Sequence, residues 1–376
     1  MIVRSENIKQ ICGMILQAVD NSNTSTITET LELKASNGKL YINVTNREYY
    51  VRAKLDVDSN IEFHATVNAN LFLKLISQIT TDTIEFNINS NSLNIKGNGN
   101  YKLPLIYNGD KLLELPEIII DNVTNEFNID SDILKSILTY NSREINKEAI
   151  AQPVQKLYYM DEQGAITFTS GACVNSFTLE QPVKLLLNSK IVKIFKLFKT
   201  GLVKFSLGYD PISDEIIQTK VKFATDSIEL TAILSCDDSN MSKVPVNAIR
   251  GRANADYPYS INVNKNAFIQ ALNRILLFNT PSDTKEIIVP HCTFEFHKDS
   301  VTIYDVYKNN KETLLYSDSV ANIEDKYIAI LNLTDLKSRL ESCNEHYLTI
   351  NFGDDKAIVI SRGNIKNVIP QCRGQQ

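Results

Sequence analysis

The residues best suited to a binding chemistry are lysines and arginines on the polar sides of predicted helices. Lys193, Lys196 and Lys199 follow one another at intervals of three residues, which places their ammonium groups on one helix face. Such a face can hold a polyanion through phosphate contacts that read no sequence. The alternative is an ordinary solvated helix face. The same pattern includes Lys9, Lys74, Lys135, Lys190, Lys265, Arg274, Lys337 and Arg339.

Residues that could catalyse a reaction do not assemble into a recognisable site. The sequence has no Gly-rich phosphate loop, no GxSxG and no HExxH motif. Among the four histidines, His64, His291, His297 and His346, only His291 and His297 could lie as a pair on neighbouring strands, where a surface or core role is favoured over a metal. We therefore expect no enzymatic activity, no cofactor and no metal.

Composition and cysteine usage indicate a globular protein of a reducing compartment. The net charge of −5 does not advertise nucleic-acid binding for the protein as a whole, although a local basic surface can exist in an acidic molecule. No apolar run is long enough to span a membrane, and the N-terminus lacks a signal-peptide pattern, so we expect a cytoplasmic protein. Six cysteines without a CxxC pair favour free thiols: Cys12, Cys173, Cys236, Cys292, Cys343 and Cys372.

Three successive parts of the chain show the same order of predicted elements. Each part reads as a helix, a run of strands, a second helix and a second run of strands. A period of over a hundred residues indicates repeated domains and not a solenoid. We expect an α+β protein with domains at 1–122, 123–250 and 251–376. The helices are expected at 6–20, 68–79, 130–140, 187–199, 265–278 and 333–341.

Three passages, in order along essentially the whole chain, resemble the bacterial DNA polymerase III beta subunit, the sliding clamp. Residues 45–48, Thr-Asn-Arg-Glu, are similar to the family's Thr-Asp-hydrophobic-Glu after a strand pair. Residues 169–174, Thr-Ser-Gly-Ala-Cys-Val, resemble its Thr-Asp-Gly-His-Arg-Leu. Near the end, residues 332–336 resemble the start of its last helix, and 368–373, Val-Ile-Pro-Gln-Cys-Arg, resemble its terminal Val-Met-Pro-Met-Arg-Leu.

The departures from the family pattern indicate a divergent clamp. Ala172 and Cys173 stand where the family has His and Arg, and Asn46 stands for an Asp. Three further residues follow Arg373, so the C-terminal residues match the family's terminal motif less closely than the other two passages match theirs. The frequent Asn, Ile and Lys residues suggest an AT-rich genome, such as that of a phage.

The resemblance implies a DNA polymerase processivity factor. Its fold would be three tandem clamp domains, each with two helices packed on β-sheets, and two copies would close head to tail into a ring. Duplex DNA would pass through the ring without sequence readout, with the cationic helix faces on the inner wall. The implied partners are double-stranded DNA, the replicative DNA polymerase, a clamp loader and a second copy of the chain, with no membrane.

The resemblance also implies where the partners and the second copy bind. Partner peptides would enter a hydrophobic pocket between the second and third domains, formed by Val154, Thr169, Gly171, Ala172, Cys173, Val174, Asn332, Ile369 and Pro370. Val154 and Val174 could instead be plain core. The dimer interface would use Tyr101, Leu277 and Phe278. An exposed Phe278 would require a covering subunit, and the alternative is that it packs internally.

A second class of protein competes with the clamp. A non-enzymatic, β-rich phage structural or interaction protein built of repeated domains would share the strand content. Paired helices with cations on their polar sides in every repeat favour the clamp. The mass of the protein in solution distinguishes the two, because a ring requires a dimer.

Overall fold

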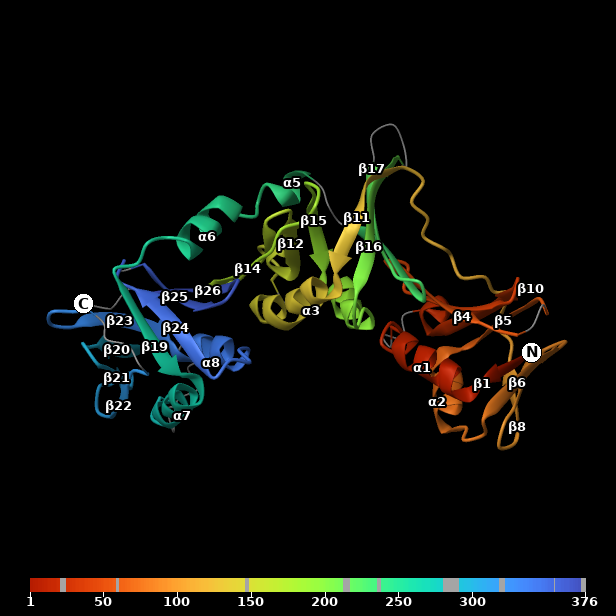
Figure 1. The fold of residues 1–376 in the computed structure, drawn as a ribbon, viewed down its shortest axis with the longest axis horizontal. Coiled ribbons are helices and arrows are strands. Elements are labelled where there is room, and N and C mark those ends of the chain that lie inside the picture. Colours follow the sequence, from red (N-terminus) through yellow and green to blue (C-terminus); the bar gives the residue numbers. More distant parts are fainter. Residues whose placement is uncertain are drawn as a thin grey trace. The chain divides into compact units, whose positions relative to one another are not determined.

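The structure is a computed structural model that describes residues 1–20, 25–58, 61–145, 149–211, 217–234, 238–279, 291–317, 322–354 and 356–372. The chain forms two compact units (Figure 1). Unit 1 contains residues 1–135 and 187–236, and unit 2 contains residues 136–186 and 237–376. Both units mix helices with antiparallel sheets, so the expected α+β class is confirmed.

Unit 1 is organised around an eight-stranded sheet in the order β11-β16-β17-β18-β4-β3-β2-β5. Its two halves meet where β18 pairs antiparallel with β4, with Leu230 opposite Val51. A separate four-stranded sheet has the order β1-β6-β7-β8, and β9 pairs with β10. The strands are β1 (Ile2–Arg4), β2 (Thr30–Ser36), β3 (Lys39–Thr45), β4 (Tyr49–Asp56), β5 (Phe63–Asn68), β6 (Thr83–Asn89), β7 (Ser92–Lys96), β8 (Asn100–Pro104), β9 (Tyr107–Asn108), β10 (Lys111–Leu112), β11 (Val123–Asp130), β16 (Leu202–Pro211), β17 (Ile217–Ala224) and β18 (Ile228–Leu234).

Unit 2 has the same plan. Its eight-stranded sheet follows the order β15-β12-β13-β14-β26-β25-β24-β19, and its halves meet where β14 pairs antiparallel with β26, with Ala172 opposite Val368. Its four-stranded sheet has the order β22-β21-β20-β23. The strands are β12 (Leu157–Asp161), β13 (Gly164–Phe168), β14 (Ala172–Ser176), β15 (Lys184–Asn188), β19 (Tyr259–Asn264), β20 (His291–Phe296), β21 (Ser300–Tyr304), β22 (Lys311–Leu315), β23 (Tyr327–Asn332), β24 (Tyr347–Phe352), β25 (Ala357–Arg362) and β26 (Ile365–Pro370).

The element order repeats three times, as the sequence pattern predicts. Each repeat runs strand, helix, four strands, helix, three strands, and each supplies two four-stranded half-sheets. The two half-sheets of the middle repeat belong to different eight-stranded sheets, which is why contacts group the chain into two units. The boundaries near residues 122 and 250 remain a prediction.

Four helices, α2, α4, α7 and α8, begin where a strand ends in an asparagine. Asn68, Asn188, Asn264 and Asn332 each end a strand and accept a hydrogen bond from the first turn of the helix that follows. Such a cap is worth about 1 kcal/mol. The helices are α1 (Ser5–Ile15), α2 (Ala69–Gln78), α3 (Ser131–Tyr140), α4 (Ser189–Ile194), α5 (Asp238–Met241), α6 (Val246–Ala253), α7 (Lys265–Leu276) and α8 (Leu333–Glu341). Short 3-10 turns are η1 (Thr26–Glu29), η2 (Asn141–Glu144), η3 (Pro153–Lys156) and η4 (Phe195–Leu197).

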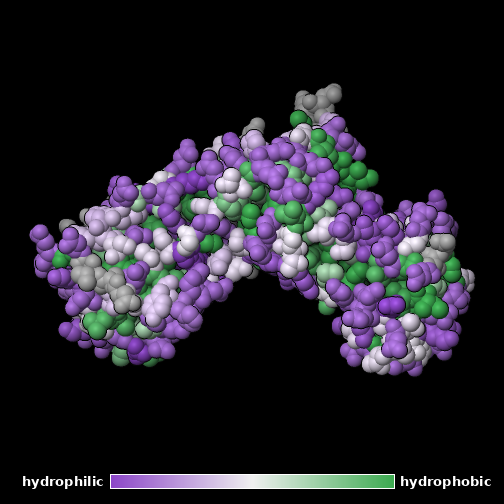
Figure 2. All heavy atoms as spheres, viewed as in Figure 1, coloured by the Kyte–Doolittle hydropathy of each residue, from purple (hydrophilic) through white to green (hydrophobic). Residues whose placement is uncertain are grey.

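Apolar faces of the paired helices pack on the sheets. In unit 1, α1 and α2 contact each other (Figure 1). Phe72 and Ile76 of α2 are fully buried. In unit 2, α7 and α8 contact each other over a core in which the rings of Phe296 and Phe352 stack with centroids 4.2 Å apart. Much of the visible surface is hydrophilic (Figure 2).

Some sequence predictions were wrong in local detail. The helix expected at 187–199 ends at Ile194 and continues only as the turn η4. Residues 177–183, between β14 and β15, form no strand. The helix α6 was not predicted, because its polar sequence shows little helical periodicity.

Candidate functional site

The predicted DNA-binding cations divide into two groups by their ion pairs. Lys135 lies 2.7 Å from Asp132, Lys190 lies 3.0 Å from Glu48, and Lys337 lies 3.6 Å from Glu341. Arg274 is paired with Glu312. Within the described ranges no ion pair is formed by the remaining members, which are Lys9, Lys74, Lys193, Lys196 and Lys199. All five belong to unit 1, so the members of the predicted set that form no ion pair among the described residues lie in that unit.

Lys193, Lys196 and Lys199 are all exposed, but they do not share one continuous helix. Lys193 lies on α4, Lys196 lies on the 3-10 turn η4, and Lys199 follows that turn. The expected single helical face is therefore wrong in geometry. The fully buried Ile194, Phe195 and Phe198 alternate with these lysines and anchor the segment against the core.

Two further cations of the pattern have partners within the protein. Arg339 is only 3% exposed, so it is not available to a polyanion. Lys265 is half-buried and donates a hydrogen bond of 2.8 Å from its Nζ to the carbonyl of Cys343. The sequence does not reveal the burial of Arg339, because its carboxylate partner Glu144 lies far away in the chain, although Leu336 and Leu340 on the same side of the helix are buried.

A cavity of about 360 Å³ in unit 2 lies at the seam of β14 and β26. Thr169, Gly171, Ala172 and Pro370, which were predicted to form the partner pocket, line it. Its other walls are mostly apolar. They are Phe168, Ser170, Pro245, Ala248, Ile249, Arg252, Lys356, Ala357 and Val368. Volume and lining are typical of a pocket for a small ligand or a peptide side chain.

The remaining predicted pocket residues do not line this cavity. Val154, Cys173, Val174 and Ile369 are at most 4% exposed, so they belong to the core, as the alternative interpretation had it for Val154 and Val174. Strand alternation explains the error for Cys173, because Ala172 and Cys173 point to opposite faces of β14. Asn332 caps α8, where its Oδ1 accepts from the Asp335 N–H at 3.1 Å.

Sequence reasoning missed the wall that α6 contributes. Arg250 of α6 donates a hydrogen bond of 2.8 Å from Nη1 to Oδ2 of Asp161 on β12. Arg252 of the same helix pairs with Asp354 in the turn before β25. The two pairs fix α6 beside the seam. Although burial alone would raise the pKa of Asp161, the hydrogen bonds from Arg250 and from the Gln163 N–H lower it.

The corner at residues 169–171 is held by a buried ionic cluster. Arg339 of α8 lies with Nε 2.6 Å from Glu144 Oε1, and its Nη2 donates to Glu144 Oε2 at 3.0 Å. Thr169 Oγ1 donates to the same Oε2 at 3.1 Å. Ser170 Oγ donates to Asp335 Oδ2 at 2.9 Å. Side chains of η2 and α8 thus form hydrogen bonds with residues of the cavity wall.

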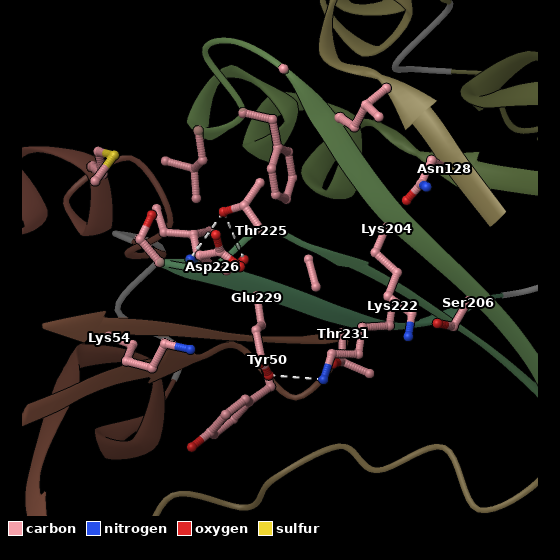
Figure 3. Close-up of a pocket in the computed structure, with 18 of the residues that line it drawn as sticks. Tyr50, Lys54, Asn128, Lys204, Ser206, Lys222, Thr225, Asp226, Glu229 and Thr231 are labelled. Carbon is pink, nitrogen blue, oxygen red and sulfur yellow. Dashed lines mark hydrogen bonds and ion pairs between the residues drawn. The ribbon is translucent and has the colours of Figure 1, made fainter. Parts of the chain in front are cut away.

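Unit 1 contains a larger and more polar groove of about 1030 Å³ (Figure 3). Lys204 and Lys222 lie on the neighbouring strands β16 and β17 and pair with Glu126 and Glu229, both at 2.8 Å. Lys54 enters the groove from β4. Because most of its charges are matched by neighbours, the groove does not select a ligand of either sign.

The predicted interface residues lie at the surface. Leu277 and Phe278 follow the end of α7 and are 73% and 51% exposed, so Phe278 does not pack internally. Tyr101 lies half-buried on β8, at the edge of the four-stranded sheet of unit 1. Two exposed apolar side chains at a chain surface are consistent with a covering partner.

The described part of the chain shows few groups suited to catalysis. Burial raises the pKa of the Cys12 and Cys173 thiols to about 12, so both stay protonated at neutral pH. No described group of three or more His, Cys, Asp or Glu residues could hold a metal ion. Among the described helices, none has the length and apolar character to cross a membrane. Cys236 and Arg373 lie outside the described residues.

We compared the chain with protein families, with known sequences and with solved structures. No family model matches the chain. A beta sliding clamp of Mycoplasmopsis pulmonis is 28% identical over 128 residues, which span 34% of this chain and 33% of that protein.

Solved structures match over the full length. The DNA polymerase III subunit beta of Pseudomonas aeruginosa superposes with a TM-score of 0.81 at 12% identity and covers 100% of both chains. The Thermotoga maritima beta subunit gives a TM-score of 0.78 at 13% identity over 99% of both chains. The Bacillus subtilis sliding clamp gives 0.77 at 14% identity over 99% of this chain and 98% of that one. The resemblance predicted from the sequence is therefore confirmed at the level of structure, and the chain has the fold of the bacterial DNA polymerase III beta sliding clamps.

Proposed function

We propose that the protein is a ring-shaped sliding clamp that encircles duplex DNA and keeps a DNA polymerase on its template. The observation that carries the proposal is the repeated junction between half-sheets. In unit 1 the last strand of the middle repeat, β18, pairs with β4 of the first repeat. In unit 2 the last strand of the third repeat, β26, pairs with β14 of the middle repeat.

The third junction of this kind is open within one chain. By position in the repeats, the missing pair consists of β8, the last strand of the first repeat, and β22, the equivalent of β4 and β14. Both are edge strands of four-stranded sheets in the described part of the chain. An open edge with unpaired backbone groups favours pairing with another chain. Two copies would therefore close two equivalent junctions, head to tail, into a ring of six repeats.

The exposed residues beside the open edges support this closure. Leu315 on β22 is 74% exposed, and Leu277 and Phe278 directly follow α7, which packs against β22. Tyr101 lies on β8. A closed pair of edges would cover these apolar side chains.

Retention on DNA would come from topology, with weak phosphate contacts that permit sliding. The five unpaired lysines of unit 1 supply such contacts, because mobile ammonium groups bind phosphates without reading bases. The paired cations Lys135, Lys190, Arg274 and Lys337 would contribute less, since neighbouring carboxylates already offset their charge. This division refines the inner-wall set predicted from the sequence.

The cavity beside α6 would receive short peptides of the polymerase and of other partners, including a clamp loader. Its lining is apolar around the seam, with Arg252 and Lys356 as its charged members. An apolar peptide side chain would be held by Phe168, Ile249 and Val368. Ala172 lines the cavity where the family has His, so the choice of partner peptide is the property of the site that transfers least from the family.

The decisive experiment combines solution mass with a replication assay. A ring requires a dimer of twice the 42.4 kDa chain mass, and it should stay on closed circular DNA but slide off linear DNA. It should also lengthen the products that the polymerase makes per binding event. A stable monomer that ignores circular DNA would contradict the proposal and favour a β-rich structural protein.

A further inference from the structure

We propose that the buried pair of Arg339 and Glu144 is a positioning device for the partner pocket. Neither residue lines the cavity, yet together they set the place of its wall at residues 169–171. The inference rests on the proposed function of that cavity as a peptide site.

The first step of the argument is burial. The side chains of Arg339 and Glu144 are each 4% exposed and meet through two contacts, Nε to Oε1 at 2.6 Å and Nη2 to Oε2 at 3.0 Å. A buried pair of this kind is weak evidence for stability, because apolar residues of similar volume often replace it without loss. Stability alone therefore does not account for the pair, and its place beside the cavity indicates a role in positioning the cavity wall.

The second step is what the pair touches. Glu144 Oε2 also accepts the Thr169 hydroxyl at 3.1 Å. The guanidinium group lies so close to Gly171 that a Cβ at this position would be 2.6 Å from Arg339 Nη2 and 2.4 Å from the carbonyl of Val368. The corner is thus hydrogen-bonded on one side and supported by a planar group on the other, and only glycine fits between that group and β26.

The third step is that the corner is a tight turn that is tied to α8 and lines the cavity. The Thr169 N–H donates to the Gly171 carbonyl at 2.8 Å, and Ser170 is tied to Asp335 of α8. Thr169, Gly171 and Ala172 line the cavity, so a shift of the corner changes the cavity's shape. Binding sites lose affinity when the supporting residues around them are loose.

The test uses Arg339→Met, the double variant Glu144→Leu with Arg339→Met, and Arg362→Met as a matched control. Arg362 is another buried arginine of unit 2, 6% exposed, which lies over the Tyr140 ring at 4.4 Å and does not line the cavity. The probe is a fluorescent peptide derived from the replicative polymerase. The measurements are its affinity for the full-length dimer, the urea midpoint, and amide exchange over residues 168–172.

We expect Arg339→Met to weaken peptide binding about tenfold and to speed exchange at the corner, because the bonds to Glu144 are lost. The double variant removes the lone buried charge, so stability should return while affinity stays low. Arg362→Met should lower stability and leave affinity unchanged. Wild-type affinity in the double variant, or unchanged corner exchange in Arg339→Met, would overturn the positioning role. If the wild-type protein binds no peptide, the proposed function of the cavity fails, and corner exchange alone then decides the role of Arg339.

Discussion

Replacing Lys193, Lys196 and Lys199 together by Gln should reduce the salt dependence of DNA binding. The three side chains are exposed and make no ion pair within the described residues, so each is free to displace a counterion from a phosphate. Each lost contact removes about 0.9 from the slope of log K against log salt, or about 2.7 for three. Over a fourfold rise in salt, the wild-type protein would then lose about 40-fold more affinity than the variant.

The assay is fluorescence anisotropy of a labelled duplex across a salt series, with thermal unfolding as a check on the fold. A matched triple variant, Lys190, Arg274 and Lys337 each to Gln, has the same charge change at positions that already face carboxylates. It should change the slope by clearly less. Equal slopes for the two triple variants, or a change below about 1 for the first, would refute the assignment of these lysines to the DNA-facing surface.

Three further predictions concern assembly and stability. Phe278→Asp should yield a monomer by light scattering, because a carboxylate would replace a phenylalanine that is 51% exposed in the single chain and covered in the proposed interface. An intact dimer would contradict that interface. Asn332→Ala should lower the free energy of unfolding in urea by about 1 kcal/mol, since the Asp335 N–H loses its cap; an unchanged value would show that water replaces it. The free energy of unfolding should fall as the pH drops below about 4, because Arg250 lowers the pKa of Asp161 in the folded state and the unfolded chain therefore takes up the proton more readily. Asp161→Asn should make this fall less steep. An unchanged pH dependence would rule out Asp161 as its source.

Sequence periodicity located most helices because their apolar faces are regular, although the helix predicted at 6–20 ends at Ile15. The helix predicted at 333–341 agrees with α8 to the residue, and Asn332 caps it as expected. The segment 187–199 was overextended, because Phe198 continues the apolar spacing although the chain leaves helical geometry after Ile194. The spacing of apolar residues does not distinguish a buried side chain on a helix from one, such as Phe198, that follows a 3-10 turn.

The candidate site was only partly predictable because it is made by pairing between distant strands. Thr169, Gly171 and Ala172 could be found from a local motif, whereas Cys173 was assigned to the wrong face of its strand. The ion pair of Arg339 with Glu144 joins residues that are 195 positions apart, and nothing in either neighbourhood signals burial. The helix α6 could not be predicted for a similar reason, because Arg250 and Arg252 pair with carboxylates that are distant in the sequence, Asp161 and Asp354.

The two linkers between repeats pack differently on their sheets, and each lines a pocket of its own unit. In unit 1 the segment before β11 stays extended on the β16–β17 hairpin: Lys220 Nζ donates to the Ile119 carbonyl at 2.7 Å, and Asp210 Oδ1 accepts from the Asn122 N–H at 2.8 Å. A Cβ at Gly208 would lie 2.2 Å from the Ile120 side chain, so linker and sheet are in direct contact there.

In unit 2 the corresponding linker coils into α6 and is held through its arginines, by Arg250 to Asp161 and by Arg252 to Asp354. The helix is thereby fixed at a distance from the β14–β26 seam that leaves the cavity beneath Ala248 and Ile249. Unit 1 carries its larger, polar groove beside the extended linker, whereas unit 2 carries a mostly apolar cavity beside α6, so the two linkers line pockets of different character.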